Sequence, residues 1–505
     1  MKRWLFLCHR WSGVFLCFFM ALWFFSGVVM MYVGYPKLTD SERLAALPEL
    51  VCNDSTPCIS LASAISTLPE RAQSSLTSIK LTSVAGQPRY QFICGRSKRI
   101  FSVDARTGRE ISSVSGLDAL HAAQAFMPDT AARTLAAVQE DTWSHSRNLD
   151  QHRPLHRVQI ADADHTLLYI STMTGDVVRK ATRTERVWNY VGAWLHWLYA
   201  FRGGPLDGAW TNIVIYLSLA GVLLALLGTV IGVMRWRFRG AYRTGEKTPY
   251  RESFMRWHHV IGITFAGICI TWIFSGLMSM NPWKIFDVHP ATPDKAAYVS
   301  GNAGNGNLHA TQFQLDASQV IGALHNTLRP REISWHRLNG ISYLVALDGA
   351  GRTRIIPADK AGVLTPQEKF STAQLVAAAK NLLPTTSAEV ELLTNYDAYY
   401  YVRDAHTMMG NSEKRLPVVR VKFDDPQQTW VHIDPYTGTI ESTLTYTKRV
   451  YRWVFGLLHS WDLPIMLASR PLWDAAMIIL SLGGFLLSTT GIVIGIRRIR
   501  KKLPG

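Results

Sequence analysis

Four histidines stand at matched places in the two halves of the chain, and a histidine side chain is among the commonest ligands for a metal cofactor. His9 and His258 are 249 residues apart, and each stands at the start of a long apolar run. His196 and His459 are 263 residues apart, and each follows a stretch rich in Trp and Tyr. A repeat with histidines at fixed places predicts two halves built alike, and therefore two pairs of equivalent ligands.

The apolar runs that would position these histidines are long enough to cross a bilayer as helices. They cover residues 11–33, 210–234, 260–280 and 472–496, and none contains Lys, Arg or Glu. We therefore predict four transmembrane helices, which with their flanking residues occupy 1–34, 209–234, 257–280 and 472–496. The first run is too long for a signal peptide and lacks a cleavage site of small residues, so we interpret it as a retained anchor.

Positive charge gathers beside one end of each predicted helix. The formal net charge is +16, and the first ten residues, the loop 235–256 and the tail 497–505 together hold 15 basic and two acidic residues. Loops rich in Lys and Arg stay in the cytoplasm, so both termini and the 235–256 loop are predicted to be cytoplasmic. The segments 35–185 and 281–448 would then form two large domains on the outer side. Because the basic residues follow the membrane topology, we exclude nucleic acid as a partner.

Each outer segment shows two strand-like units that end in tight turns. The turns lie at 104–108 and 174–175 in the first segment and at 361–362 and 434–438 in the second. The segments lead into 186–204 and 449–463, where Trp and Tyr favour helices lying at the outer membrane interface. Cys52 and Cys58 flank a turn-like stretch and form the candidate disulfide, while Cys94 leaves two other pairings open. Metal binding by a cysteine pair is the alternative, but no histidine lies near in sequence.

The repeat also predicts how the histidines meet. Two parallel repeats imply a pseudo-two-fold axis along the membrane normal, so equivalent residues lie at the same depth and face each other. His9 and His258 would then meet near the cytoplasmic surface, and His196 and His459 near the outer surface. Two histidine pairs in a four-helix bundle are what two bis-histidine haems require. His259 is the alternate ligand to His258.

Glycines near the histidines fit the same interpretation. Gly13 and Gly262 lie one helical turn past His9 and His258, where a missing side chain leaves room for a porphyrin. The plainer alternative is that each histidine is an ordinary interfacial residue and that the small residues serve helix packing.

Several motifs together resemble the PepSY-associated transmembrane family, and the resemblance covers nearly the whole chain. They are His9-Arg10-Trp11 with Gly13, Leu416-Pro417-Val418, Asp434-Pro435-Tyr436-Thr437-Gly438, Leu457-Leu458-His459-Ser460 and Arg470-Pro471-Leu472-Trp473-Asp474. The resemblance implies an iron-regulated inner-membrane protein of bacteria whose outer units are PepSY-like and periplasmic. Better understood members resemble di-haem reductases of ferric siderophores. The departure is His258-His259, where the second repeat lacks the Arg-Trp that follows His9.

The expected fold is therefore an α+β membrane protein made of two parallel repeats, each with two transmembrane helices, a periplasmic PepSY-like domain and an interfacial helix. The expected function is transmembrane electron transfer through two haems b to a ferric siderophore or another Fe(III) chelate. No flavin- or dinucleotide-binding motif is present, so quinol or a separate reductase would be the electron donor. Two alternatives are a non-catalytic PepSY binding or regulatory module on a membrane anchor, and a protein for haem transport or storage.

Overall fold

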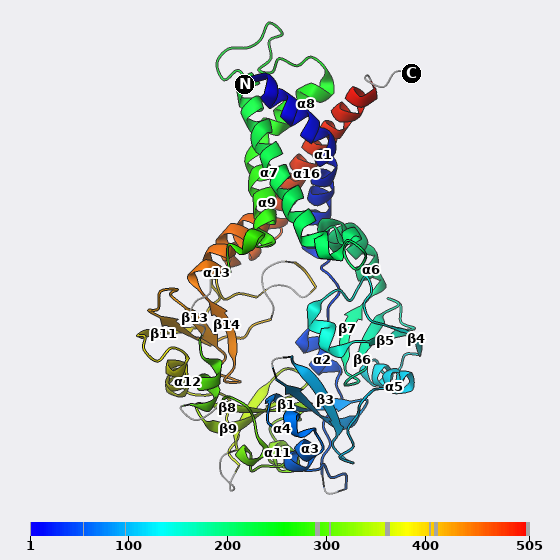
Figure 1. Cartoon of the computed structure of the whole chain (residues 1–505), viewed down its shortest axis with the longest axis vertical. Coiled ribbons are helices and arrows are strands. Elements are labelled where there is room, and N and C mark those ends of the chain that lie inside the picture. Colours follow the sequence, from blue (N-terminus) through cyan, green and yellow to red (C-terminus); the bar gives the residue numbers. More distant parts are fainter. Residues whose placement is uncertain are drawn as a thin grey trace.

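The chain folds into a bundle of long helices at one end and a mixed part of strands and short helices at the other (Figure 1). In this computed structural model the described residues are 2–53, 55–95, 97–287, 293–301, 305–358, 364–402, 406–408 and 413–500. Both termini lie at the free end of the bundle, as does the loop that follows residue 235, and the strands lie at the opposite end (Figure 1). This arrangement places the three basic segments of the sequence together.

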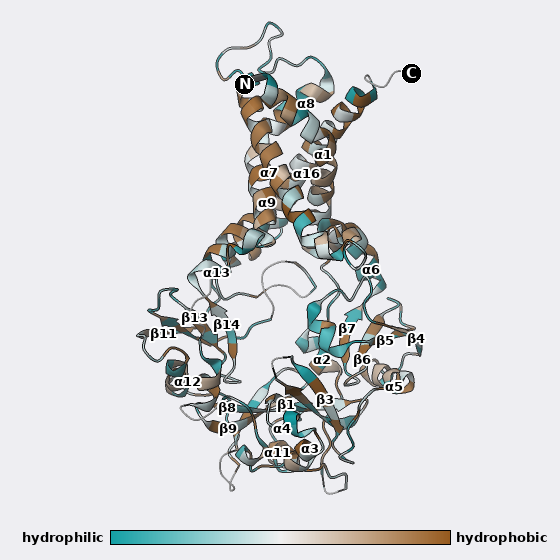
Figure 2. Cartoon of the chain, in the orientation of Figure 1, coloured by the Kyte–Doolittle hydropathy of each residue, from teal (hydrophilic) through white to brown (hydrophobic). Residues whose placement is uncertain are grey.

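The bundle consists of strongly apolar helices. They are α1 (Lys2–Tyr32), α7 (Trp210–Arg235), α8 (Ser253–Thr264), α9 (Ala266–Ser279) and α16 (Leu472–Arg500). Of these, α1, α7 and α16 are each long and apolar enough to cross a membrane. Large apolar side chains such as Phe15, Leu223 and Leu482 are exposed on the outside of the bundle, which is apolar along its length (Figure 2). A continuous exposed apolar surface of this size is typical of a face that contacts lipid.

The helices α8 and α9 amount to a fourth span only if they are counted together, because they are bent by 69°. The sequence predicts one uninterrupted helix over 257–280, whereas the structure breaks it at Phe265, which has φ −105° and ψ 10°. The ring of Phe265 lies so close to Gly483 of α16 that no Cβ would fit there. The bend therefore accompanies a close ring-to-backbone contact that the apolar pattern of either helix does not reveal.

Two short helical segments lead into the bundle from the part that contains the strands, which we call the outer part. The first is α6 (Arg183–Asn189) with a π-helical turn at Tyr190–Trp194, and the second is α13 (Tyr446–Tyr451) with a π-helical turn at Arg452–Leu457 and α14 (Leu458–Ser460). Each segment ends in a residue with left-handed backbone, Leu198 at φ 54° and Trp461 at φ 49°. The indole of Trp210 then donates to the Trp197 carbonyl, and that of Trp473 to the Trp461 carbonyl. These bonds fix each segment against the helix that follows it.

The outer part contains three antiparallel sheets. One has the strand order β10-β9-β8-β1-β2-β3, a second β4-β5-β6-β7 and a third β11-β12-β13-β14. The strands are β1 (Leu76–Val84), β2 (Gln87–Cys94), β3 (Arg99–Asp104), β4 (Ala132–Val138), β5 (Leu155–Ile160), β6 (Leu167–Ser171), β7 (Val177–Ala181), β8 (Glu332–Leu338), β9 (Ile341–Leu347), β10 (Thr353–Pro357), β11 (Ala388–Leu393), β12 (Val418–Phe423), β13 (Trp430–Ile433) and β14 (Ile440–Leu444). Short helices accompany them: α2 (Asp40–Ala46), α3 (Leu61–Ser66), α4 (Glu70–Gln73), α5 (Gly116–Phe126), α10 (Lys295–Ser300), α11 (Ala317–Leu324), α12 (Thr372–Ala379) and α15 (Pro464–Leu467).

The six-stranded sheet joins the two outer segments. Strand β1 of the first segment pairs antiparallel with β8 of the second, with Ile79 opposite Trp335 and Leu81 opposite Ile333. One buried core, which includes Tyr90, Phe92 and Trp335, draws residues from both segments. The sequence predicts strand-like stretches in both outer segments, but it does not predict β8, nor that strands some 250 residues apart share a sheet. The predicted turn at 361–362 lies outside the described residues.

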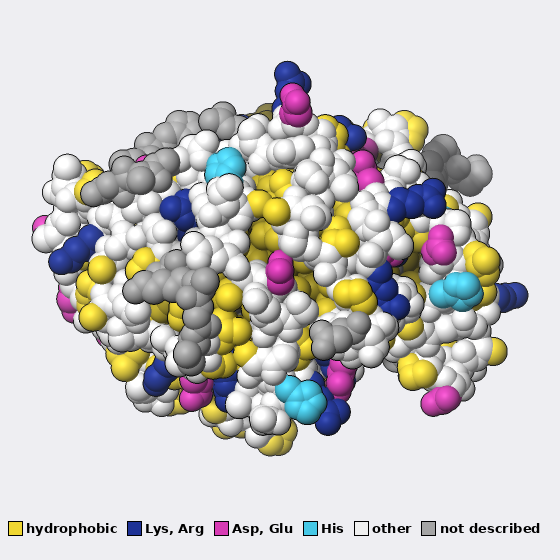
Figure 3. All heavy atoms as spheres, turned by 90° about the horizontal axis from the view of Figure 1, so that it is seen from below, with side chains coloured by type: hydrophobic (Ala, Val, Ile, Leu, Met, Phe, Trp, Pro, Cys, Tyr) yellow, Lys and Arg dark blue, Asp and Glu magenta, His cyan; other side chains and the backbone are white. Residues whose placement is uncertain are grey.

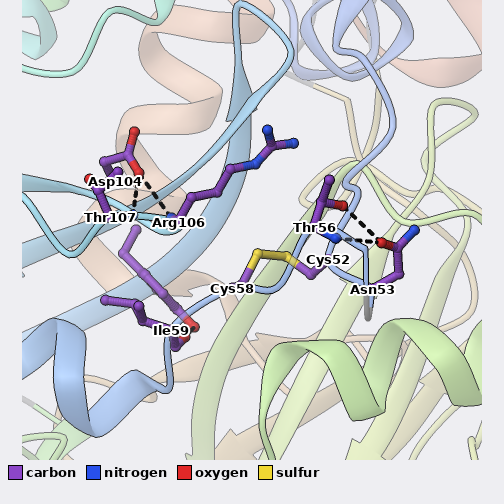
Figure 4. Close-up of a disulfide and its surroundings, with 9 residues drawn as sticks. Cys52, Asn53, Thr56, Cys58, Ile59, Asp104, Arg106 and Thr107 are labelled. Atoms are coloured by element: carbon purple, nitrogen blue, oxygen red, sulfur yellow. Dashed lines mark hydrogen bonds between the residues drawn. A yellow bond between two sulfur atoms is a disulfide. The ribbon is translucent and has the colours of Figure 1, made fainter.

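Cys52 and Cys58 form a disulfide (Figure 4). The turn between them is closed by hydrogen bonds from the backbone N–H and the hydroxyl of Thr56 to the Asn53 side chain, at 2.9 and 2.8 Å. Directly after the bridge, the Ile59 N–H donates to the Ala105 carbonyl at 2.7 Å. The hydrogen bond of Ile59 therefore ties the segment after the bridge to the turn that follows β3. Cys94 is buried and carries a free thiol.

Buried ion pairs also connect the two outer segments. Glu332 at the start of β8 contacts Arg43 at 2.8 Å and Lys80 at 3.3 Å. Burial alone would raise the pKa of Glu332, but the two cations outweigh it and lower the pKa to about 2. His406 of the second segment lies between Glu185 at 2.9 Å and Glu42 at 3.1 Å in the first segment. Contact with Glu185 and the charge of Glu42 raise the pKa of His406 against the effect of burial.

The face of the outer part farthest from the bundle carries side chains of both charges scattered over it (Figure 3). They are not gathered into one acidic or one basic patch in this view. Electrostatics on this face therefore does not single out a docking place for a strongly charged ligand.

Candidate functional site

A partly open cavity of 410 Å³ lies at the outer end of the bundle, and His196 and His459 both line it. The centres of their imidazole rings lie 6.0 Å apart. The wall around them is apolar and aromatic, with Trp23, Trp272 and Phe455 among its members. Cavities of about 300–1,000 Å³ are the usual size of small-molecule sites in proteins.

The two outer histidines are held by matching serines of α1 and α9. Ser26 Oγ lies 3.0 Å from His196 Nδ1, and Ser275 Oγ lies 3.0 Å from His459 Nδ1. The hydroxyl of Ser26 donates to the Leu22 carbonyl, and that of Ser275 to the Trp272 carbonyl. Because each hydroxyl proton is used within its own helix, the oxygen accepts from Nδ1–H. This fixes the tautomer that leaves the Nε2 lone pair free, as in a metal-bound histidine whose other nitrogen is hydrogen-bonded.

A glycine borders each of these two rings. A Cβ at Gly27 or at Gly276 would lie 3.6 Å from the Cε1 atom of His196 or His459, respectively. The serine and the glycine are consecutive on each helix, so one Ser-Gly pair both bonds and borders one imidazole. The sequence carries this signal, because Phe-Ser-Gly recurs at 25–27 and 274–276.

A second cavity, of 390 Å³, lies at the free end of the bundle, and His9 and His258 line it. Their ring centres are 6.3 Å apart. The predicted pair Gly13 and Gly262 also lines this cavity. His9 packs against Gly228 of α7, where a Cβ would lie 2.8 Å from its Cε1, and His258 lies near Gly491 of α16 in the same way, at 3.4 Å.

Backbone and hydroxyl groups orient His258. Its Nδ1 lies 3.2 Å from the Leu487 carbonyl and 3.0 Å from Thr490 Oγ1. A carbonyl only accepts, so Nδ1 carries the proton and Nε2 is left free. The Leu224 carbonyl, which is equivalent to that of Leu487, lies near the His9 ring. It does not form a hydrogen bond with His9 Nδ1, which has no hydrogen-bond partner among the described residues.

His259 is oriented differently from its neighbour. Its Nδ1 lies 2.7 Å from Thr248 Oγ1, and its Nε2 donates to the Gly232 carbonyl at 2.9 Å. Both ring nitrogens are therefore engaged, and the rings of Trp236 and Tyr250 flank the imidazole edge to face. His258, rather than His259, lies opposite His9.

The spacing of both pairs fits two ligands on one metal ion. A metal-bound imidazole nitrogen lies about 2 Å from the ion and about 1 Å from the centre of its own ring, so two imidazoles across one ion have ring centres about 6 Å apart. The observed separations are 6.0 and 6.3 Å. Each pair lies on the wall of a cavity. Nδ1 is hydrogen-bonded in three of the four rings, and Nε2 has no protein partner among the described residues in any of them.

Residues 6–327 match the family described as the PepSY-associated TM region. This is well over half of the chain. The chain belongs to that family. No curated protein sequence matches it. The matched region of the PepSY-associated family contains His9, His196 and His258 and ends before His459, so the fourth histidine is identified by its equivalent place in the second half and by its position in the outer cavity.

The two cavities of this PepSY-associated protein are close to one another. Met20 of α1 lines both. The rings of Phe24 and Trp272 line the outer cavity and lie 6.1 Å apart. The two cavities therefore approach each other at Met20.

The tyrosines between 396 and 401 are used structurally. The hydroxyls of Tyr396 and Tyr400 donate to the Lys414 and Arg415 carbonyls. That of Tyr399 accepts from the Trp453 indole. This cluster therefore offers no free set of phenol ligands. Within the described ranges, no group of three or more His, Cys, Asp or Glu side chains could hold a bare metal ion.

Proposed function

We propose that the chain is a di-haem electron-transfer protein of the bacterial inner membrane, which carries electrons to a ferric siderophore or another Fe(III) chelate in the periplasm. The observation that carries this proposal is the pair of cavities, each with two histidines whose ring centres are 6.0 or 6.3 Å apart. When bound between two imidazoles, haem iron accepts and donates single electrons. His9 with His258 would hold one haem, and His196 with His459 the other.

The topology we propose has four spans from two parallel repeats, with α8 and α9 forming one broken span. The three basic segments meet at the free end of the bundle, which supports a cytoplasmic location for that end (Figure 1). The sheets would then be periplasmic PepSY-like units. The disulfide between Cys52 and Cys58 fits an oxidising compartment.

The chain's own residues would orient and insulate the electron path. The Ser26 and Ser275 oxygens hold two imidazoles in the ligating tautomer. The wall of the outer cavity is mainly apolar, and Met20 borders both cavities. One quinol, oxidised to quinone with release of two protons, would supply two electrons; a separate reductase is the other source. Two Fe(III) chelates would each take one electron and become Fe(II) chelates, which oxygen-rich siderophores bind far less tightly.

The first test is the haem content of the purified full chain after expression with ample haem. We expect two haems b per polypeptide and a reduced-minus-oxidised spectrum of low-spin bis-histidine haem. His196→Ala and His459→Ala should each remove the same one of two spectral components, and His9→Ala and His258→Ala the other. His259→Ala is the matched control and should retain both. A wild-type chain without haem would refute the proposal.

The second test addresses the acceptor. Ferric siderophores are added to the reduced protein without oxygen, and the haem spectrum is followed. We expect reoxidation that produces one Fe(II) per electron, trapped by a ferrous chelator. A protein that holds two haems but is reoxidised by none of the Fe(III) chelates would remove the assigned acceptor. Haem that exchanges rapidly with a scavenger protein would favour haem transport instead.

A further inference from the structure

The two cavities differ in charge. No Lys, Arg, Asp or Glu is among the described residues that line the outer cavity. The second cavity, at the free end of the bundle, is the inner cavity. Three arginines line it: Arg10 of α1, Arg235 of α7 and Arg498 of α16. All three are exposed, so they lie where the cavity meets solvent. An apolar cavity with cations at its edge is suited to a flat apolar ligand that carries anionic groups at one side.

These arginines have no carboxylate partner in the described part of the chain. The two acidic residues of the 235–256 loop are already engaged, since Glu246 pairs with Arg256 at 2.7 Å and Glu252 with Arg497 at 2.6 Å. Arg235 lies over the Phe6 ring, 5.0 Å from its centre. The local carboxylates therefore neutralise other arginines, and the cations at the cavity remain available to an anion.

Their spacing along the helices places two of them in register with the histidine pair. Arg235 is seven residues after Gly228, and Arg498 is seven residues after Gly491. Seven residues are almost two turns, so each arginine is on the same helix face as the glycine that borders a ligand imidazole, about 10 Å farther along the axis. That distance is comparable with half the width of a porphyrin plus a two-carbon carboxylate arm. Arg10 directly follows His9 and adds a third cation.

We propose that Arg235 and Arg498, with Arg10, bind the two carboxylate side chains of the tetrapyrrole held by His9 and His258. This proposal rests on the proposed function. A guanidinium can bind a carboxylate through two parallel hydrogen bonds, which fixes the rotation of the ring within the cavity. The outer cavity lacks such cations on its described wall, so its occupant would be oriented by the histidines and by shape. The two haems would therefore differ in their response to charge.

The test compares the two spectral components in a redox titration of the full-length holoprotein. Arg235→Gln and Arg498→Gln should each lower the midpoint potential of the component that His9→Ala removes, because loss of a nearby cation favours the oxidised iron. They should also speed transfer of that haem to a scavenger protein by roughly 10-fold or more, as changes around metal ligands commonly do. Arg235→Lys and Arg498→Lys retain the charge and should recover most of the potential. The outer component should not change.

The matched controls are Arg256→Gln and Arg497→Gln, which remove a cation from the same end of the bundle but outside the cavity. Equal shifts in the controls and in the cavity variants would reduce the effect to general surface charge and overturn the proposal. The proposal would also be overturned if the cavity variants leave the inner haem unchanged and differ from the wild type only in their binding to phosphatidylglycerol vesicles compared with phosphatidylcholine vesicles. The arginines would then bind lipid phosphate. A wild-type chain without haem would overturn the proposed function as well, whereas unchanged haem in the cavity variants overturns this inference alone.

Discussion

If the chain binds two haems as proposed, replacing Gly228 by alanine should loosen the inner haem and leave the outer one in place. A Cβ at this position would lie 2.8 Å from Cε1 of His9 and 3.4 Å from its Nδ1. Carbon atoms pack best at about 3.5–4.0 Å, so the imidazole has to retreat by about 0.7 Å or rotate away from His258. Either movement spoils the spacing that two ligands on one ion require.

The size of the effect follows from two independent estimates. Overpacking a close contact costs about 1–3 kcal/mol. Disturbing the groups that orient a metal ligand commonly costs 10–100-fold in affinity, which is about 1.4–2.8 kcal/mol. Since alanine is favourable in a helix interior, Gly228→Ala should not weaken α7 itself. The loss should therefore fall on the inner haem rather than on the fold.

The control uses the same substitution beside the outer pair. A Cβ at Gly27 or Gly276 would lie 3.6 Å from the neighbouring histidine ring, an ordinary contact. Haem transfer to an excess of scavenger protein, followed separately for the two spectral components, measures both cases. We expect the inner component of Gly228→Ala to transfer 10–100 times faster than in the wild type, and the outer component of Gly27→Ala to change by less than about threefold. Equal rates in the two variants would refute the argument from contact distance.

Three further predictions concern other contacts. Ser26→Ala and Ser275→Ala should each weaken retention of the outer haem by about 0.5–1.5 kcal/mol, and by similar amounts because the two hydrogen bonds are of equal length; haem transfer rates would show an unequal pair. The pKa of Glu332 is held at about 2, so the stabilising contribution of its carboxylate is complete above the ordinary pKa of 4.5 and is lost as the pH falls toward 2. Glu332→Gln should therefore destabilise the outer part by about 3–5 kcal/mol at neutral pH. In urea unfolding, the free energy of unfolding of the variant should also fall less between pH 4.5 and pH 2 than that of the wild type. The pKa of His406 is raised, so its ion pairs should be complete below pH 6.5 and lost as the pH rises through the raised value. The protection factors of the α2 amides, which are corrected for the intrinsic exchange rate at each pH, should therefore fall over that range in the wild type and stay constant in His406→Gln.

The sequence predicted which histidines meet because the information was carried by equal separations. His9 with His258, and His196 with His459, were paired from the repeat alone. In the structure the two ring centres of each pair lie about 6 Å apart. It could not decide between His258 and His259, since consecutive residues point about 100° apart around a helix and only packing shows which one faces the partner. Their roles as haem ligands remain a prediction.

The features that the sequence did not reveal depend on contacts between distant segments. Local patterns predict strands in both outer segments, but the pairing of β1 with β8 depends on how the whole outer part is assembled, because the two strands lie some 250 residues apart. The break at Phe265 likewise depends on Gly483 of another helix. Ser26 and Ser275 were only partly predictable. The sequence shows that Phe-Ser-Gly recurs, but it does not show that each serine contacts a histidine of a different segment.

The matched contacts also explain why neither half of the chain could form a site alone. The outer cavity takes His196 with its serine from the first half and His459 with its serine from the second. The inner cavity takes His9 and Gly228 from the first half, and His258 and Gly491 from the second. Each ring is therefore supported within its own half, while the ring opposite comes from the other half. Two identical supported histidines become a two-ligand site only where the halves meet, and the pairing of β1 with β8 holds them together at the far end of the molecule. A change that separates the halves should consequently weaken both cavities at once, whereas a change at one histidine affects one.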